Sequence, residues 1–199
     1  MSWLTNISPL EAMPAKTPDK RRRLVNAATK LFYQQGFSRT TLAHIATVAD
    51  VPLGNVYYYF KSKEALGLAL VEQRLADDRA RRARWDRLPD PKDRLVAFVQ
   101  MTLDNRRRLA RSGCPIGSLC TELHKEDGPL PAQASRPFAE WLSWLEQQFR
   151  ALGHGGEAPG NAAHMLAVLQ GATVLTHSFG TPKYIENEAR QLMDWIGGL

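Results

Sequence analysis

The sequence is poor in the features that mark secreted and membrane proteins. Its 199 residues include only two cysteines, Cys114 and Cys120, too few for a disulfide framework, so reduced thiols are expected. No apolar run reaches the ~18 residues needed to span a bilayer. The first residues lack the basic and apolar regions of a secretory signal. These absences predict a cytoplasmic protein that does not associate with membranes.

Motifs of enzymes are also missing. There is no nucleophile elbow, no His-Glu-x-x-His pair and no phosphate-binding glycine loop, since Gly155-Gly156 follows no strand. Cys120 and His124 lie four residues apart, a spacing that can chelate a metal on one helix face. Two ligands do not make a structural site, and a second pair at such a spacing is missing. The sequence therefore predicts neither an enzyme nor a bound metal or cofactor.

Positive charge is present but confined to one end of the chain. Residues 1–63 contain nine Lys/Arg and three Asp/Glu, and therefore carry the whole net charge of +6, whereas residues 64–199 balance 17 basic against 17 acidic side chains. This segregation is typical of a domain that neutralises phosphates, and a merely soluble basic surface would not predict it.

The stretch 40–63 has the pattern of a helix-turn-helix. Four apolar residues follow the i, i+3, i+4, i+7 spacing of one helix face: Leu42, Ile45, Ala46 and Ala49. Pro52 is tolerated at the start of a second short helix, expected from Leu53 to about Tyr58. Ser62 can then cap a third helix. A pair of short helices joined by a tight turn places the second one in the major groove of DNA.

This stretch resembles the DNA-binding pattern of the tetracycline-repressor-like (TetR) family. The matching residues are Gly36-Phe37, Thr40-Thr41, Ile45-Ala46, Ala49, Val51, Gly54, Tyr57, Tyr59-Phe60, Ser62-Lys63 and Leu66. Asp50 departs from the usual glycine and must enter the left-handed region at some cost. Pro52 replaces the usual Ser or Thr, so a hydroxyl that could cap the helix or contact a phosphate is absent.

The resemblance implies which residues contact a double-stranded DNA operator. The candidates for base edges are Leu53, Asn55 and Tyr58. The candidates for phosphates are Thr41, Tyr57 and Lys63. The family binds palindromic operators as homodimers through its last two helices, so the same assembly is expected here.

The remainder predicts an all-α chain, with an N-terminal helix-turn-helix three-helix head and a C-terminal helical ligand and dimerisation domain. We expect a flexible arm over 1–17, the head over 18–63 and the body over 64–199. Thr17-Pro18 is expected to start the first helix. A flexible linker is expected over 153–160, with Asn161 capping the helix that follows.

A long helix from Glu64 to about Trp85 is expected to link head and body. Its first half should pack on the head. Its second half is rich in arginine, but interleaved Asp77, Asp78 and Asp86 indicate a solvated, salt-bridged face rather than a second DNA site.

The final two helices carry small and aliphatic residues suited to close packing against another helix pair. Ala167, Gly171, Val174 and Leu175 would let two backbones approach, while Leu192 and Ile196 would fill the seam.

Cys114 is the first candidate for sensing an effector. It precedes Pro115, at the start of an expected helix with Arg111 close by, and both a helix N-terminus and a cation stabilise a thiolate. The segment GCPIGSL, followed by Glu122, resembles one in a TetR-family branch that includes thiol-based electrophile and oxidant sensors. The alternative is a small buried residue at a tight helix start.

Aromatic and polar side chains of the body could instead line a cavity for an apolar or aromatic small molecule, although ordinary core packing also explains most of them. With the second cysteine, these candidates are Phe98, Met101, Cys120, Thr121, Trp141, Gln170 and His177. The sequence thus predicts a homodimeric, ligand-responsive transcriptional repressor. The alternative is a constitutive DNA-binding architectural or adaptor protein without a ligand, which a fully packed body would favour.

Overall fold

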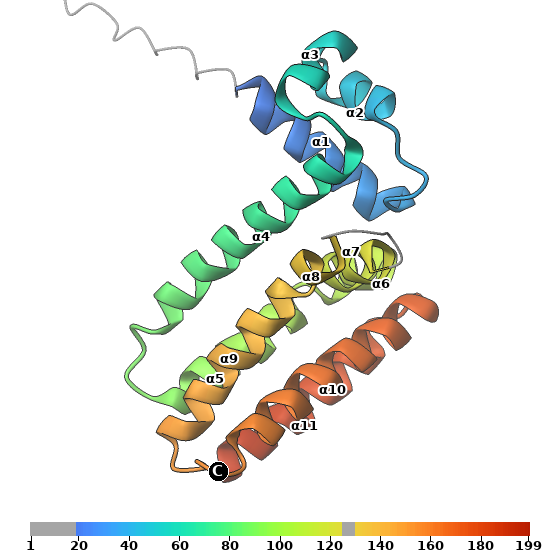
Figure 1. The fold of residues 1–199 in the computed structure, drawn as a ribbon. Helices are drawn as coiled ribbons and strands as arrows, with labels where there is room; N and C mark the ends of the chain where they lie inside the picture. The colour runs from blue at the N-terminus through green and yellow to red at the C-terminus, as the bar shows by residue number, and fades with distance from the viewer. Residues whose placement is uncertain (1–18, 125–129) are drawn as a thin grey trace, which may run out of the picture.

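The computed structural model describes residues 19–124 and 130–199, and all regular structure in these ranges is helical (Figure 1). The helices in chain order are α1 (Lys20–Gln35), α2 (Leu42–Ala49), α3 (Leu53–Tyr59), α4 (Lys63–Trp85), α5 (Pro91–Asp104), α6 (Arg106–Ser112), α7 (Pro115–Leu123), α8 (Leu130–Ala134), α9 (Arg136–Ala151), α10 (Ala158–Ser178) and α11 (Lys183–Gly198). The predicted all-α class is confirmed. The predicted arm over 1–17 lies outside the described residues.

Helices α1 to α3 form the head, and α4 leads from it along the body (Figure 1). Asp19 caps α1 by accepting a hydrogen bond from the backbone N–H of Arg21 at 3.2 Å. The helix therefore starts later than the Thr17-Pro18 prediction, and those two residues lie outside the described ranges. A carboxylate suits this position because it pairs with an otherwise unsatisfied N–H at the helix start.

The buried apolar residues form two main clusters. The first joins the head to the beginning of α4 and to α7, and includes Phe37, Leu66 and Leu123. The second lies among α5, α9, α10 and α11 around Trp141 and Phe149. Helix α7 is therefore part of the body in sequence but packs into the core of the head.

Three expectations for the body were wrong in detail. Asp78 and Arg82 of α4 are only 2% and 8% exposed, because α9 packs over this face and brings Glu140 to Arg82 at 2.5 Å. The arginine-rich half of α4 is thus salt-bridged, as predicted, but is not fully solvated. Helix α10 begins at Ala158 rather than being capped by Asn161, since Pro159 is well tolerated in a first helical turn.

The third correction concerns the dimer interface, which Leu192 and Ile196 were expected to fill. Leu192 and Ile196 are 3% and 1% exposed and pack inside their own protomer, in the second cluster. They point inward because α11 needs an apolar stripe to pack against α5 and α10.

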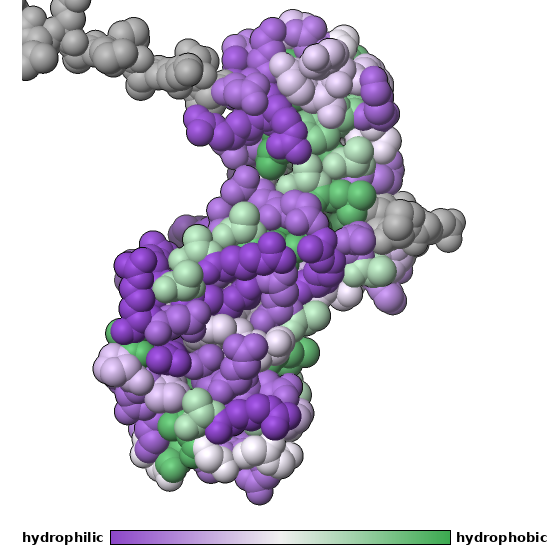
Figure 2. All heavy atoms as spheres, turned by 60° about the vertical axis from the view of Figure 1, so that its left-hand side comes forward, coloured by the Kyte–Doolittle hydropathy of each residue, from purple (hydrophilic) through white to green (hydrophobic). Residues whose placement is uncertain are grey.

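One face of the molecule is predominantly polar. Figure 2 shows a largely hydrophilic face over head and body, with hydrophobic residues in small separate groups. Among the described helices, none combines the length and apolar content that a membrane crossing requires.

Candidate DNA-binding head and effector cavity

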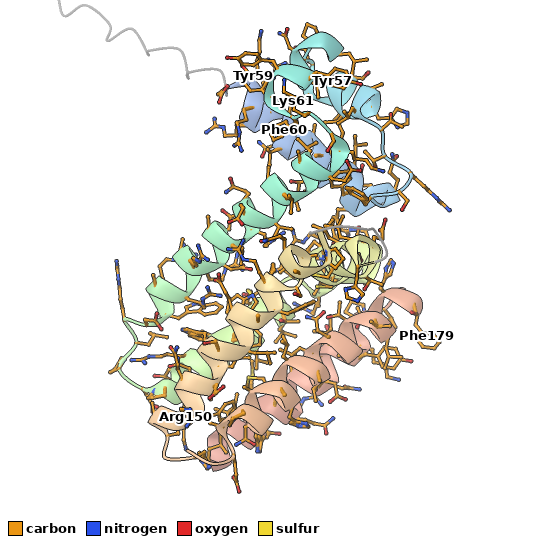
Figure 3. The ribbon with its side chains drawn as sticks, in the orientation of Figure 1. Tyr57, Tyr59, Phe60, Lys61, Arg150 and Phe179 are labelled. Carbon is orange, nitrogen blue, oxygen red and sulfur yellow. The ribbon has the colours of Figure 1, made fainter. Side chains whose placement is uncertain are left out.

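Helix α3 is held to the head by one buried residue and presents large side chains outward. Val56 is fully buried, whereas Leu53, Tyr57 and Tyr58 are 42%, 49% and 78% exposed. Figure 3 shows Tyr57 at the outer end of the head. Asn55 is half-buried on the same helix. Exposure of three large apolar or aromatic residues on a seven-residue helix is unusual for a surface that contacts only water.

The tight turn between α2 and α3 depends on Asp50. This residue has φ 50° and ψ 52°, in the left-handed region that the sequence required. Arg23 of α1 stabilises the turn, since its guanidinium donates to the carbonyl of Ala49 at 2.9 Å and pairs with the Asp50 carboxylate at 2.7 Å. These contacts from α1 therefore help to hold Asp50 in a backbone conformation that glycine would adopt more readily.

Two of the candidate phosphate contacts are already engaged within the head. The Thr41 hydroxyl caps α2 by accepting from the N–H of His44 at 3.2 Å. The Lys63 ammonium donates to the carbonyl of Phe37 at 3.1 Å and lies 4.2 Å from the centre of that ring. Lys61, which sequence reasoning did not single out as a DNA contact, is exposed in the head two residues after the end of α3 (Figure 3).

Helix α7 of the body is fastened to the head by Glu122. Its Oε2 accepts hydrogen bonds from the backbone N–H groups of Phe37 at 2.6 Å and Ser38 at 3.2 Å, in the loop between α1 and α2. Gly36 has φ 88°, and a Cβ there would lie 3.0 Å from both carboxylate oxygens. Glycine at this position therefore allows both the turn and the close approach of the carboxylate.

A second link joins α1 to the start of α7. The Tyr33 hydroxyl donates to the carbonyl of Gly113 at 2.8 Å, next to Cys114. Burial raises the pKa of Tyr33, so its hydroxyl stays protonated and remains a donor at neutral pH. Both ends of α7 are thus connected to the head.

The body contains a cavity of about 320 Å³ beside α4. Five predicted candidates line it: Phe98, Met101, Cys114, Trp141 and Gln170. The cavity is also lined by four charged residues that the sequence did not indicate as effector contacts: Arg74, Asp78, Arg81 and Arg108. The first three recur at i, i+4 and i+7 on α4, a spacing that places them on one helix face.

The remaining candidates lie around a more open hollow of about 530 Å³ between α7 and α10. Cys120, Thr121 and His177 line it, together with Cys114 and Gln170, which it shares with the first cavity. The Nδ1 atom of His177 lies 3.3 Å from the carbonyl oxygen of Ala110. The sequence-based set is therefore divided between two neighbouring spaces rather than gathered in one.

The two cysteines have different environments. Cys114 is the N-cap of α7, and its Sγ accepts from the N–H of Gly117 at 3.2 Å. Cys120 donates to the carbonyl of Ala134 at 2.6 Å, and burial raises its pKa to about 12. Cys120 is therefore a thiol at neutral pH and a poor nucleophile. Within 19–124 and 130–199, no three metal-ligating side chains come together.

Asp78 is the one acidic residue of the cavity wall. Its Oδ2 accepts from the indole N–H of Trp141 at 3.2 Å, and its Oδ1 lies 3.4 Å from the guanidinium of Arg81. Burial raises the pKa of Asp78, against the lowering effect of Arg74 and Arg81. Its oxygens thus already have partners within the wall.

One face of α10 is apolar and uncovered. Val174, Leu175 and Phe179 are 63%, 43% and 65% exposed, and Gly171 is exposed beside them. Figure 3 shows Phe179 projecting from the end of α10. A contiguous apolar strip of this kind indicates an interaction surface.

Comparison with known proteins identifies relatives along most of the chain. A family model described as "Bacterial regulatory proteins, tetR family" matches residues 24–70, and one described as "Transcriptional regulator LmrA/YxaF-like, C-terminal domain" matches residues 91–191. The chain is 27% identical over 168 residues to the HTH-type transcriptional regulator LmrA of Bacillus subtilis, covering 79% of this chain and 86% of that protein. It is 32% identical over 110 residues to the HTH-type transcriptional repressor NemR of Escherichia coli, covering 54% of each.

Solved structures share the fold. The reduced form of E. coli NemR superposes with a TM-score of 0.77 at 23% identity, covering 88% of this chain and 96% of that one. A TetR transcriptional regulator from Legionella pneumophila superposes with a TM-score of 0.81 at 18% identity, covering 89% and 97%. These structural relatives are transcriptional regulators with the same arrangement of a helical head and body.

Proposed function

Because the chain belongs to the TetR family of transcriptional regulators, we propose that it is a ligand-responsive repressor that binds a palindromic operator as a homodimer. A small-molecule effector releases it from DNA in the cytoplasm. Members of this family are generally not enzymes. One observation carries the proposal: a cavity of about 320 Å³ is lined by α4, the helix that also packs into the head.

DNA recognition is assigned to α3 and its surroundings. Leu53, Asn55 and Tyr58 contact base edges, and the phosphates are met by Thr41, Tyr57 and Lys63. The exposure of Leu53, Tyr57 and Tyr58 supports this assignment. Lys63 keeps two further donors after its bond to Phe37, and exposed Lys61 adds a second cation.

Asn55→Ala and Lys63→Ala test this assignment on operator and random DNA. Loss of a base contact costs ~1–3 kcal/mol at one position and relaxes sequence preference. Loss of a phosphate contact weakens all sequences alike and lowers the slope of affinity against salt by about one. Equal losses of Asn55→Ala on both kinds of DNA would rule out a base contact there.

The dimer forms through the exposed face of α10 together with α11. The apolar strip of Val174, Leu175 and Phe179 supports this, as does Gly171, where an added Cβ would have no atom of the protomer within 4 Å. Two heads held by one dimer read two half-sites, so an operator with two-fold symmetry is expected.

The effector acts through α4 and α7, which touch both the cavity and the head. Cys114 and Ile116 at the start of α7 line the cavity, and Glu122 near its end holds the α1–α2 loop. A ligand that binds one arrangement of α7 more tightly than another therefore biases the position of the head. The constitutive alternative without a ligand is disfavoured by the open space beside α4.

A further inference from the structure

The cavity wall beside α4 carries an excess of positive charge. Three of its residues are arginines, Arg74 and Arg81 from α4 and Arg108 from α6, against the single carboxylate of Asp78. Cationic side chains are rare in the lining of a small-molecule site unless they meet an opposite charge.

One of the three cations already has a partner. Arg81 approaches Asp78 at 3.4 Å and the sulfur of Met101 at 2.8 Å. Arg74 and Arg108, in contrast, make no side-chain hydrogen bond or ion pair with any residue in the described ranges 19–124 and 130–199. The wall therefore offers two guanidinium groups with their donors available.

These two groups line the same cavity, together with Cys114, Pro115 and Ile116 at the start of α7. The charges of both Arg108 and Arg74 act on the Tyr33 hydroxyl and lower its pKa, against the stronger effect of burial. Tyr33 and Arg74 also line one small hollow between α1 and α7. Arg74 is therefore close to the Tyr33 side chain, at the junction of head and body, and Arg108 lines the same cavity as Arg74.

The wall also carries an aromatic surface. The rings of Phe98 and Trp141 are in contact, with centroids 4.9 Å apart, and both residues are 3% exposed. Leu166 and Leu169 of α10 continue this surface. A flat apolar group can lie against it, and at about 320 Å³ the space is at the lower end of the usual ~300–1,000 Å³ for ligand sites.

We propose that the effector is an organic carboxylate whose flat apolar body packs against Phe98 and Trp141, while Arg74 and Arg108 bind its carboxylate. This inference rests on the proposed effector site and specifies the charge of the ligand that binds there. Arginine suits this role because its planar donors match a carboxylate in a bidentate manner, and charge-assisted bonds are strong in a partly enclosed site.

A cationic ligand fits the cavity less well. Asp78 would be its only counter-charge, and the Trp141 indole and Arg81 already occupy the Asp78 oxygens. The anionic end, moreover, would lie next to the Tyr33–Gly113 link and so could influence the contact between α1 and α7.

The test compares three probes of one shape and different charge: 2-naphthoate, 2-naphthylmethanol and 2-naphthylmethylamine. Isothermal titration measures their binding to the wild-type protein and to the double variant Arg74→Gln/Arg108→Gln. Arg107→Gln is the matched control, since Arg107 is the neighbour of Arg108 on α6 and is likewise exposed, but does not line the cavity. Circular dichroism and thermal melting show that each variant is folded.

We expect the wild type and the Arg107→Gln control to bind 2-naphthoate at least about tenfold more tightly than the alcohol, with the amine weakest. The double variant should bind the acid and the alcohol within about threefold of each other, because the apolar wall is retained. Equal binding of acid and alcohol by the wild type would overturn the proposal. So would an unchanged preference in the double variant, or no detectable binding of 2-naphthoate at about 1 mM.

Operator binding in the presence of 2-naphthoate separates this inference from the proposed function. Charge-selective binding that leaves operator affinity unchanged would preserve the carboxylate site and contradict release by an effector. Release of the operator by all three probes alike would support an effector site and overturn its preference for anions.

Discussion

The contact of Glu122 with the head gives the most direct test of how head and body are joined. Removing the carboxylate in Glu122→Ala leaves the N–H groups of Phe37 and Ser38 without their acceptor. Hydrogen bonds to charged groups contribute about 1.5–3 kcal/mol each to the free energy of unfolding. The bond to Phe37 is short and partly buried, while the bond to Ser38 is longer and exposed. Most of the lost free energy is therefore expected from the bond to Phe37.

The expected loss for Glu122→Ala is therefore about 2–3 kcal/mol. For a chain of this size, each kcal/mol lowers the melting temperature by about 2–4 °C, which predicts a decrease of roughly 4–12 °C. Glu122→Gln keeps an acceptor but loses the charge, so it should restore about half of the difference. Operator affinity should also fall for Glu122→Ala, because the α1–α2 loop is no longer held to α7.

Glu157→Ala is the matched control. The Glu157 side chain is 79% exposed and lies 3.9 Å from His154, so the same substitution there should leave both stability and operator affinity unchanged. Calorimetry and fluorescence anisotropy with labelled operator measure the two effects. A melting temperature of Glu122→Ala within about 1 °C of the control would show that the carboxylate does not hold the head.

Three further predictions concern dimerisation, pH dependence and thiol reactivity. Gly171→Trp should give a folded monomer in sedimentation, because Gly171 is exposed and an added Cβ there meets no atom of the protomer within 4 Å; a dimer of unchanged affinity would exclude this face. The Glu140 pKa is lowered, mainly by its hydrogen bond to Arg79, so Glu140 stabilises the fold above its ordinary pKa of 4.5 and less as the pH falls through the lowered value. The difference in melting temperature between wild type and Glu140→Gln should therefore shrink between pH 7 and about pH 3, and a constant difference would contradict this. Maleimide should modify Cys114 before Cys120, since the pKa of Cys120 is raised to about 12, and mass spectrometry showing the reverse order would leave Cys114 as a structural residue.

The helix-turn-helix could be read from the sequence because its signals are local. Apolar spacing from Leu42 to Ala49, the break at Asp50-Val51-Pro52 and the serine cap at Ser62 each act within one or two helical turns. The segregation of positive charge into 1–63 is likewise a property of the chain itself. The all-α class followed from these patterns, whereas the family assignment followed from the resemblance of residues between Gly36 and Leu66 to the family pattern; both are confirmed, by the fold and by the comparisons.

The composition of the cavity could only partly be predicted. The aromatic and sulfur side chains of Phe98, Met101 and Trp141 indicated a place for a ligand, but the same residues are equally typical of a packed core. The arginines of α4 were assigned to a solvated face, because their sequence neighbours are acidic. Whether such a residue faces water or a cavity depends on which helices pack against it. Arg79 and Arg82 meet Glu140 of α9, about 60 residues further along the chain, whereas Arg81 meets Met101 of α5 beside the cavity.

Contacts between distant residues decided the rest. The sequence alone determined the helices, the helix-turn-helix of the head and the location of the positive charge, because helix formation and capping depend on near neighbours. Only the tertiary structure placed Glu122 on a loop 84–85 residues earlier, turned Leu192 and Ile196 into the protomer core, and brought Arg74 and Arg108 into the wall of one cavity. Such contacts arise when amphipathic helices pack, and many packings satisfy the same apolar periodicity.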